Sequence, residues 1–200
     1  TGINYSTLEV YLNGTLLAAD KYTLDQTTGL VTIPGLTELT AGTTIRVVAY
    51  DNYYNKLDRT STLHSIEYIS GEEGNEEKVT QLYWDRDTIV APTPANKTGY
   101  TFSKWEYSNP VHSSMMPDTN VVVNATYTIN QYTLKFEYDG QVISETSVDY
   151  NSDIVVPSLD GYSKVGYTFT GWDVTVPEKM PANDLTIKAV FEINKHNVTI

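Results

Sequence analysis

A motif that occurs twice constrains the fold of this chain more than any other feature. Residues 99–105 read Gly-Tyr-Thr-Phe-Ser-Lys-Trp, and residues 166–172, which begin 67 positions later (166 minus 99), read Gly-Tyr-Thr-Phe-Thr-Gly-Trp. A Met-Pro pair follows each copy, at Met116-Pro117 and at Met180-Pro181. A self-similarity of this period is typical of tandem modules, so the sequence predicts an array.

The segment after each Met-Pro pair supports a common fold for the two copies. Apolar residues alternate there with polar ones at an offset of 64 positions (180 minus 116): Val121, Val123, Ala125, Tyr127 and Ile129 correspond to Leu185, Ile187, Ala189, Phe191 and Ile193. Alternation of this kind predicts a half-buried strand. We predict that residues 131–194 superpose on residues 62–129, with gaps in the 105–116 loop and between Ile89 and Gly99.

Strand patterns also dominate the rest of the chain. Residues 8–12 alternate before Asn13-Gly14, a pair that favours a tight hairpin turn, and residues 132–138 place four apolar side chains on one face. No segment has the 3.6-residue period of a helix of ordinary length. The chain is therefore predicted to be all-β.

Composition excludes several classes of function. The chain has 200 residues, with 25 acidic and 13 basic side chains and a net charge of -12, so it would repel nucleic acid and anionic lipid. Cysteine is absent, which excludes disulfides, a thiolate nucleophile and a cysteine-based zinc site. The sequence contains no apolar run near the roughly 18 residues of a membrane helix, so we expect no membrane insertion in this segment.

The repeat period sets the expected domains. We predict a first module over residues 1–61, repeats over residues 62–130 and 131–195, and the start of a further repeat over residues 196–200, where His-Asn-Val-Thr-Ile resembles the opening of the preceding unit at 132–136. Units of about 65 residues are marginally stable alone, so neighbouring repeats are the expected partners of each other. Linkers of three residues predict an elongated rod, and the start of a further repeat predicts a segment of a longer protein.

The second copy carries a family resemblance. Its motif at 166–172, the Met-Pro-Ala-Asn-Asp at 180–184 and the strand ending Ala-Val-Phe-Glu-Ile-Asn at 189–194 resemble the B-repeat of internalin-type bacterial surface proteins, also called the Listeria-Bacteroides repeat. Residues 62–129 resemble a diverged member, because Ser103-Lys104 replaces Thr-Gly before the Trp. The resemblance implies a small β-grasp-like module without catalytic activity, found in tandem in cell-surface proteins and in some phage virion proteins.

Residues 1–61 carry a different resemblance. Thr-Gly-Ile, Val-Tyr-Leu-Asn-Gly-Thr and Gly-Thr-Thr-Ile-Arg-Val-Val-Ala-Tyr occur in that order and are similar to the later strands of bacterial immunoglobulin-like domains. This resemblance implies an Ig-like β-sandwich module that lacks its opening strand.

A small group of oxygen-bearing side chains is the candidate metal site. Asp51, Asn55 and Asp58 follow the last predicted strand of the first module, where calcium could take carboxylate and amide oxygens. Turn chemistry selects the same residue types, and the Asp-x-Asp-x-Asp-Gly spacing is missing. We therefore expect a turn and no bound metal, with a metal site as the alternative.

The sequence offers no enzyme signature. His64 and His196 occupy the repeat position of Tyr132, a column that accepts a flat amphipathic ring, and His112 lies in the loop of variable length. Four carboxylates crowd the predicted hairpin tip at 71–77, where solvation rather than paired-carboxylate catalysis is expected. No nucleophile elbow, zinc-binding helix or phosphate-binding glycine loop is present, so we predict a protein that is not an enzyme and needs no cofactor.

Aromatic residues divide into two groups. Those at the same place in both repeats are predicted structural anchors: Trp105, Trp172, Phe102, Phe169, Tyr100 and Tyr167. Tyr53, Tyr54 and Tyr107 lie outside this register and are candidates for exposed contacts. Lys135 alternates out of phase with Leu134 and Phe136, so we expect it to face solvent rather than to form an intramolecular cross-link.

These observations favour a structural function. We predict a non-catalytic stalk or spacer of an adhesin-like protein, extracellular and on a bacterial cell surface, that projects a binding part. A phage virion appendage or capsid decoration, on the virion surface, is one alternative. A carbohydrate-binding module is the other. A cell-surface protein or a glycan is the further partner that each of these functions implies.

Overall fold

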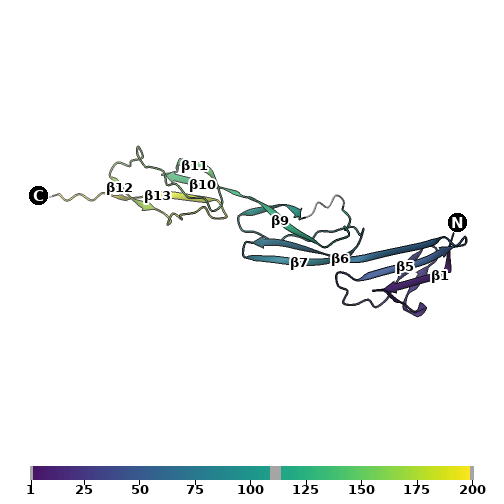
Figure 1. Cartoon of the computed structure of the whole chain (residues 1–200). Helices are drawn as coiled ribbons and strands as arrows, with labels where there is room; N and C mark the ends of the chain where they lie inside the picture. Colours follow the sequence, from purple (N-terminus) through teal and green to yellow (C-terminus); the bar gives the residue numbers. More distant parts are fainter. Residues whose placement is uncertain (1, 109–113, 199–200) are drawn as a thin grey trace. The chain divides into compact units, whose positions relative to one another are not determined.

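The computed structural model describes residues 2–108 and 114–198, and confirms the all-β prediction (Figure 1). One 3-10 turn, η1 (Ala19–Lys21), is the only helical element among these residues. The strands are β1 (Ile3–Leu12), β2 (Thr15–Leu16), β3 (Thr23–Asp25), β4 (Leu30–Thr32), β5 (Thr44–Asp51), β6 (Lys56–Glu72), β7 (Asn75–Trp84), β8 (Tyr100–Tyr107), β9 (Val121–Ile129), β10 (Gln131–Tyr138), β11 (Gln141–Asp149), β12 (Tyr167–Trp172) and β13 (Leu185–Ile193).

The chain forms two compact units. One contains the described residues up to Ala95 and those from Trp105 to Ala125, and the other contains Asn96–Lys104 and the described residues from Thr126 onward. Strands β8 and β9 therefore contribute residues to both units. Because β6 continues without a break from Lys56 to Glu72, it crosses the boundary predicted after residue 61, and the predicted domain limits stay a prediction.

A long shared strand organises the sheet that holds β1. The strand order is β2-β1-β5-β6-β9-β8, with β7 also paired to β6, while β3 and β4 form a separate two-stranded sheet. The first part of β6 pairs with β5, as far as Thr62 opposite Thr44, and the rest pairs with β7 from Leu63 opposite Trp84. A strand of 17 residues can serve two partners in succession, and β6 does so.

The two repeats have the same strand order. One reads β7-β6-β9-β8 and the other β11-β10-β13-β12, each with a parallel pair at its centre and an antiparallel hairpin partner, β7 or β11, on one side. The central registers also correspond, because Tyr68 faces Val123 in one and Phe136 faces Ile187 in the other. The arrangement agrees with the predicted superposition of residues 131–194 on residues 62–129.

The prediction of where the repeats differ in length was incomplete. In the first hairpin Tyr83 pairs with His64, 19 positions earlier (83 minus 64), whereas in the second Val148 pairs with Tyr132, 16 positions earlier (148 minus 132). A third gap, of three residues, thus lies in the hairpin itself. Alternation predicts each strand but not its partner residue, because the turn fixes the register of a hairpin.

Each repeat buries a small cluster of side chains around one aromatic ring, called here the central ring, which belongs to Tyr68 in the first repeat and to Phe136 in the second. Ile66, Tyr68, Met116, Val121 and Val123 form the first cluster, and Leu134, Phe136, Met180 and Ile187 form the second. The methionines are 2% and 1% exposed, although the sequence marked them only as turn residues. Met is flexible enough to fill the irregular space under a loop, which accounts for its place beneath the Met-Pro turn.

Backbone hydrogen bonds hold each methionine in this place. The N–H of Met116 donates to the Asp87 carbonyl at 2.7 Å, and the N–H of Met180 donates to the Ser152 carbonyl at 2.9 Å. The carbonyls of the same methionines accept bonds of 2.9 Å from the N–H groups of Arg86 and Asn151. The turn is therefore fastened to the segment that follows the hairpin, in the same way in both repeats.

The repeated tryptophans pack against the central ring. Trp105 meets Tyr68 edge to face, with ring centroids 5.0 Å apart, and Trp172 meets Phe136 at the same separation. Both tryptophans are partly buried and lie against their clusters. Edge-to-face pairs at this distance add stability beyond the area that they bury.

Replacing Trp172 by Ala is expected to destabilise the second unit by about 3 kcal/mol, because a large aromatic contact with the core is lost. Hydrogen exchange should show loss of protection mainly within residues 131–194. Val165→Ala is the matched control, since Val165 is 98% exposed and its truncation should leave exchange unchanged. Unchanged protection in Trp172→Ala would contradict the anchor assignment.

The Tyr68 hydroxyl is buried without a hydrogen-bond partner among the described residues. Its residue is 1% exposed, and burial, followed by the nearby Tyr107 and Tyr83, raises the pKa of the hydroxyl above its ordinary value. Phe136 fills the same position in the second repeat with no hydroxyl. Desolvation of the Tyr68 hydroxyl is thus a cost that the second repeat does not carry.

We expect Tyr68→Phe to leave stability unchanged or to raise it by up to about 2 kcal/mol, because it removes an unpaired buried polar group. The pKa of the Tyr68 phenol is raised in the folded state, so the unfolded chain loses this proton at a lower pH than the folded chain does. The contribution of this phenol to the free energy of unfolding is therefore constant below the ordinary pKa of 10.0 and falls at higher pH. The wild type should therefore lose stability relative to Tyr68→Phe above that pH in denaturant titrations. Tyr83→Phe is the control, and should cost about 1 kcal/mol because the Tyr83 hydroxyl bonds the Val90 backbone.

Candidate functional site

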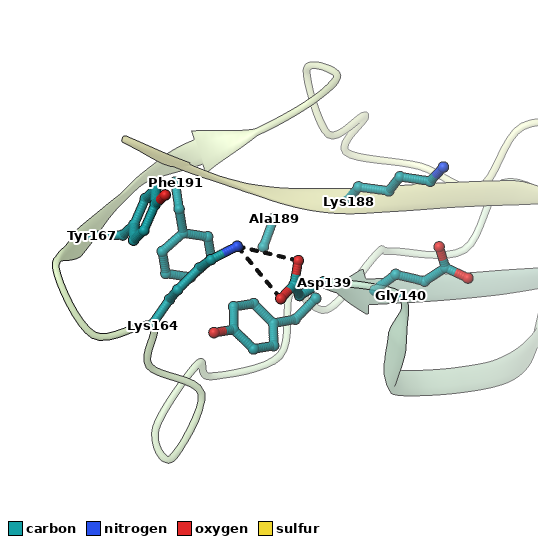
Figure 2. A pocket seen from close by; sticks show the side chains of 9 residues that line it. Asp139, Gly140, Lys164, Tyr167, Lys188, Ala189 and Phe191 are labelled. Carbon is teal, nitrogen blue, oxygen red and sulfur yellow. Dashed lines mark hydrogen bonds and ion pairs between the residues drawn. The ribbon is translucent and has the colours of Figure 1, made fainter. Parts of the chain in front are cut away.

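A recess of about 310 Å³ lies beside the turn between β10 and β11 (Figure 2). Its walls come from three strands and from the loop before β12: Glu137, Tyr138, Asp139, Gly140, Lys164, Tyr167, Lys188, Ala189 and Phe191. Tyr138 and Phe191 meet edge to face with centroids 5.0 Å apart. The recess is therefore a hollow in an aromatic cluster, rimmed by charge.

Two of the charged side chains at this recess, Lys164 and Asp139, pair with each other. The Lys164 ammonium lies 3.3 and 3.4 Å from the two oxygens of Asp139 and 4.9 Å from the Tyr167 ring centroid. Figure 2 shows this ammonium between the ring and the carboxylate, with the Lys188 side chain extending elsewhere. The lining contains no His, Ser, Thr or Cys, and of its Lys and carboxylate side chains Lys164 and Asp139 are bound to each other.

Glu137, also in this wall, belongs to a second ion pair. Its Oε1 lies 2.7 Å from Nζ of Lys135, and this contact lowers the pKa of the Glu137 carboxyl and raises the pKa of Lys135. Lys135 is partly buried on β10 rather than fully turned to solvent. Its ammonium is thus occupied by a carboxylate on its own strand.

Asp51 and Asn55, two of the three candidate metal ligands, form a turn. Asp51 Oδ1 accepts the N–H groups of Tyr53 and Asn55, each at 2.8 Å, and Oδ2 accepts the Asn55 side-chain amide at 2.8 Å. These bonds, the one from the Asn55 side chain first, lower the pKa of the Asp51 carboxyl. The carboxylate oxygens of Asp51 therefore accept hydrogen bonds that define the turn.

Asp58, the third candidate, lies in β6 and is bound by two cations. Arg46 donates from Nε to Oδ1 at 2.7 Å and from Nη2 to Oδ2 at 2.5 Å, while Lys56 Nζ lies 2.7 Å from Oδ2. Within the described residues no group of three or more His, Cys, Asp or Glu side chains could hold a metal ion. The hydrogen bonds from Arg46 and Lys56 hold the pKa of the Asp58 carboxyl well below its usual range.

Replacing Asp58 by Asn should lower stability at neutral pH, because Arg46 and Lys56 lose their shared partner. The folded-state pKa is depressed, so the contribution of Asp58 is present above its ordinary pKa of 3.8 and is lost as the pH falls towards the folded-state value. Urea titrations should show a difference between wild type and variant that shrinks below that pH. Asp160→Asn, at an exposed carboxylate, should show no such change; a pH-independent difference for Asp58→Asn would contradict the ion-pair explanation.

Two neighbouring tyrosines on the same turn are the most exposed aromatics of the first module. Tyr53 is 72% and Tyr54 is 89% exposed, and Tyr54 has a φ of 64°, which is uncommon for a bulky residue. A recess of about 210 Å³ beside them is lined by Tyr54, Asn52 and Thr7, among others. The predicted exposure of this pair therefore holds, whereas Tyr107 packs partly buried against the first core because it shares a face of β8 with Trp105.

The two histidines that the structure describes, His64 and His196, belong to different units. His64 is partly buried on β6, with Nε2 3.0 Å from Oδ1 of Asp118, and His196 is exposed in the segment after β13. His112 lies outside the described residues. A carboxylate on the exposed Asp118 can orient the His64 ring, but no serine or cysteine completes a triad in the hydrogen bonds of the described chain.

The ends of the two repeats share a set of contacts that the sequence analysis missed. Lys97 Nζ lies 4.8 Å from the Tyr100 ring centroid, as Lys164 lies 4.9 Å from that of Tyr167. The sequence signal was present, because Lys97 and Lys164 stand two residues before the glycine of each repeated motif. The motif thus begins at the lysine, and its cation covers the first aromatic ring.

An asparagine side chain also accepts a hydrogen bond from the repeated motif in each copy. Thr101 Oγ1 donates to Asn130 Oδ1 at 2.6 Å, and Thr168 Oγ1 donates to Asn194 Oδ1 at 2.6 Å. Each asparagine follows the isoleucine that ends the last strand of its repeat. The Asn of the linker is therefore a structural part of the repeat.

Comparison with protein families agrees with this geometry. Residues 132–190 match the Listeria-Bacteroides repeat domain, and residues 65–131 match the Divergent InlB B-repeat domain. These residues are internalin-type B-repeat modules. The resemblance predicted from the repeated motif is confirmed for both copies, the first of them as a divergent member.

The chain is also similar in sequence to individual bacterial proteins. The chain is 32% identical over 126 residues to internalin H of Listeria monocytogenes serovar 1/2a, covering 54% of this chain and 22% of that protein. It is 28% identical over 146 residues to a putative Gly-rich membrane protein of Evansella cellulosilytica, covering 66% of this chain and 17% of the relative. The match therefore spans about a fifth of each relative's length.

None of the helical structure in the described residues is long and apolar enough to cross a membrane.

Proposed function

We propose that this chain is a non-catalytic repeat region, a stalk or spacer of a surface-exposed adhesin-like protein. The observation that carries the proposal is the identical strand order and central register of two consecutive B-repeats. Only Asn130 separates β9 of one repeat from β10 of the next. Modules that recur in this way add length with each copy while each keeps its own core.

The similarity to internalin H and to proteins described as membrane proteins supports a bacterial cell surface as the location. The absence of cysteine and the net charge of -12 suit a solvated extracellular segment that is not held by disulfides. In this proposal, other parts of the full protein bind the cell-surface protein or the glycan.

The chemistry of the described residues supports a non-catalytic role. Lys164 and Asp139 of the aromatic recess beside the β10–β11 turn pair with each other, and the candidate metal ligands serve a turn and a strand ion pair. Side chains that are mutually satisfied stabilise a scaffold and leave little for proton transfer.

Deletion of residues 131–194 from the parent protein is expected to leave partner affinity unchanged while shortening the particle. The reason is that each repeat contributes distance but no indispensable contact. Binding assays and small-angle scattering on the parent and the deletion measure the two effects separately. A matched control replaces residues 131–194 by a second copy of residues 65–130, which should restore the maximum dimension.

Loss of binding in a folded deletion would overturn the spacer assignment and locate recognition within the repeat. Loss in the deletion and recovery in the replacement would instead show that distance itself is required.

A carbohydrate-binding function is the second candidate, favoured by the exposed Tyr53 and Tyr54 beside a recess that Asn52 and Thr7 help to line. Flat aromatic rings with nearby amide and hydroxyl groups suit sugar rings. A glycan array probed with the wild type and with Tyr54→Ala distinguishes the candidates. Selective binding lost in the variant favours the lectin function, and silence in both favours the spacer.

A further inference from the structure

The ring of Tyr150 rests directly on Gly99 within the second unit. A Cβ atom built on Gly99 would lie 2.2 Å from Cδ1 and Cγ of Tyr150, so no residue other than glycine fits beneath this ring. Tyr150 also meets Tyr100 edge to face, with centroids 5.9 Å apart. The glycine of the repeated motif therefore provides a seat for an aromatic side chain of the following repeat.

Backbone hydrogen bonds fix the position of this ring. The N–H of Asn130 donates to the Gly99 carbonyl at 2.9 Å, and the N–H of Tyr150 donates to the Asn130 carbonyl at 2.9 Å. Asn130 is itself held by Thr101 through its side chain. The glycine, the linker asparagine and the incoming tyrosine thus form one connected set.

The end of the second repeat reproduces this set without the incoming ring. The N–H of Asn194 donates to the Gly166 carbonyl at 2.7 Å, and Thr168 bonds the Asn194 side chain as Thr101 bonds that of Asn130. The φ angle of Gly166 is 78°, close to the 75° of Gly99. The backbone seat is therefore already formed.

Exposure distinguishes the two seats. A Cβ atom on Gly166 would meet nothing within 4 Å, and Gly166 and Asn194 are exposed whereas Gly99 is buried and Asn130 is partly buried. Tyr167 is 37% exposed, and Figure 2 shows it with Lys164 at the edge of the aromatic recess. The second seat is open in the described chain.

We propose that Gly166, Tyr167 and Asn194 form a docking seat for a further B-repeat in the same polypeptide. That repeat would place an aromatic ring on Gly166 and donate its backbone N–H to the Asn194 carbonyl. Residues 196–200 resemble the opening of a repeat, which favours a covalently following module as the occupant. The ring would come 20 positions after Asn194, as Tyr150 follows Asn130 (150 minus 130).

This inference rests on the proposed function, since it takes the chain as part of an array and names what each repeat recognises. Its test reads a local contact at Gly166, whereas the spacer test reads partner affinity. The two can therefore fail independently.

The first experiment compares the two glycines in the present chain. Gly99→Ala and Gly166→Ala share the strain of a positive φ, but only Gly99 lies under a ring. The unfolding constant should rise at least about tenfold more for Gly99→Ala than for Gly166→Ala, as a tenfold change is the ordinary scale of one lost core contact. Equal effects would contradict the assignment of Gly99 as a seat.

An NMR measurement keeps this comparison valid if Gly99→Ala fails to fold. Ring current from Tyr150 should move an Hα resonance of Gly99 upfield, while the Hα resonances of Gly166 stay near ordinary values. In Tyr150→Leu the Gly99 resonance should return downfield. An ordinary Hα chemical shift for Gly99 in the wild type would contradict the placement of the Tyr150 ring on Gly99 and so overturn the proposal.

The decisive experiment extends the chain by appending a copy of residues 131–194 directly after Asn194. The Gly166 Hα resonance should then move upfield as that of Gly99 does, and Gly166→Ala should become as destabilising as Gly99→Ala. Tyr150→Leu in the appended copy alone is the matched control and should abolish both effects.

Two outcomes would overturn the proposal. One is an unchanged Gly166 resonance in an extended chain whose appended core is protected from hydrogen exchange. The other is an upfield shift of Gly166 in the unextended chain that grows with protein concentration, which would identify a second copy as the occupant.

Discussion

The central parallel strand pair of each repeat is the constraint on which the rest of the B-repeats depends. It sets Tyr68 against Val123 and Phe136 against Ile187, and so places one aromatic ring in the middle of a small core. The tryptophan packs against that ring from one neighbouring strand, and the methionine lies with it in the same buried cluster. A module of this size has few buried side chains, so each contact at the ring carries a large share of its stability.

Many carboxylates of this acidic chain are either hydrogen-bonded within the fold or exposed to solvent. The carboxylates with lowered pKa values, such as Asp58 and Asp51, accept hydrogen bonds from cations or turn backbone, and the acidic residues of the β6–β7 hairpin tip are exposed. The recess of the second repeat likewise pairs Lys164 with Asp139 and covers an aromatic ring with the same ammonium. These arrangements stabilise local geometry, and they agree with a repeat that holds distance rather than performs a reaction.

Much of the fold could be predicted because strand alternation and repetition are local properties of a sequence. The pattern at residues 121–129 and its counterpart at 185–193 indicated the correct strands, and the repeated motif indicated the family. The hairpin gap escaped prediction, since alternation does not say which residues face each other across a turn. The burial of Met116 and Met180 escaped it as well, because a Met-Pro pair indicates a turn but not the core beneath that turn.

The sequence by itself determined that Gly99 and Gly166 are equivalent, because each opens the same repeated motif. It also determined the all-β class, because only strands satisfy the observed alternation. Only the tertiary structure decided that Gly99 lies beneath Tyr150 while Gly166 lies open, and that the Tyr68 hydroxyl is buried without a partner among the described residues. The physical reason is that these contacts join residues far apart in the chain, and they depend on where the strands bring each side chain rather than on its neighbours in sequence.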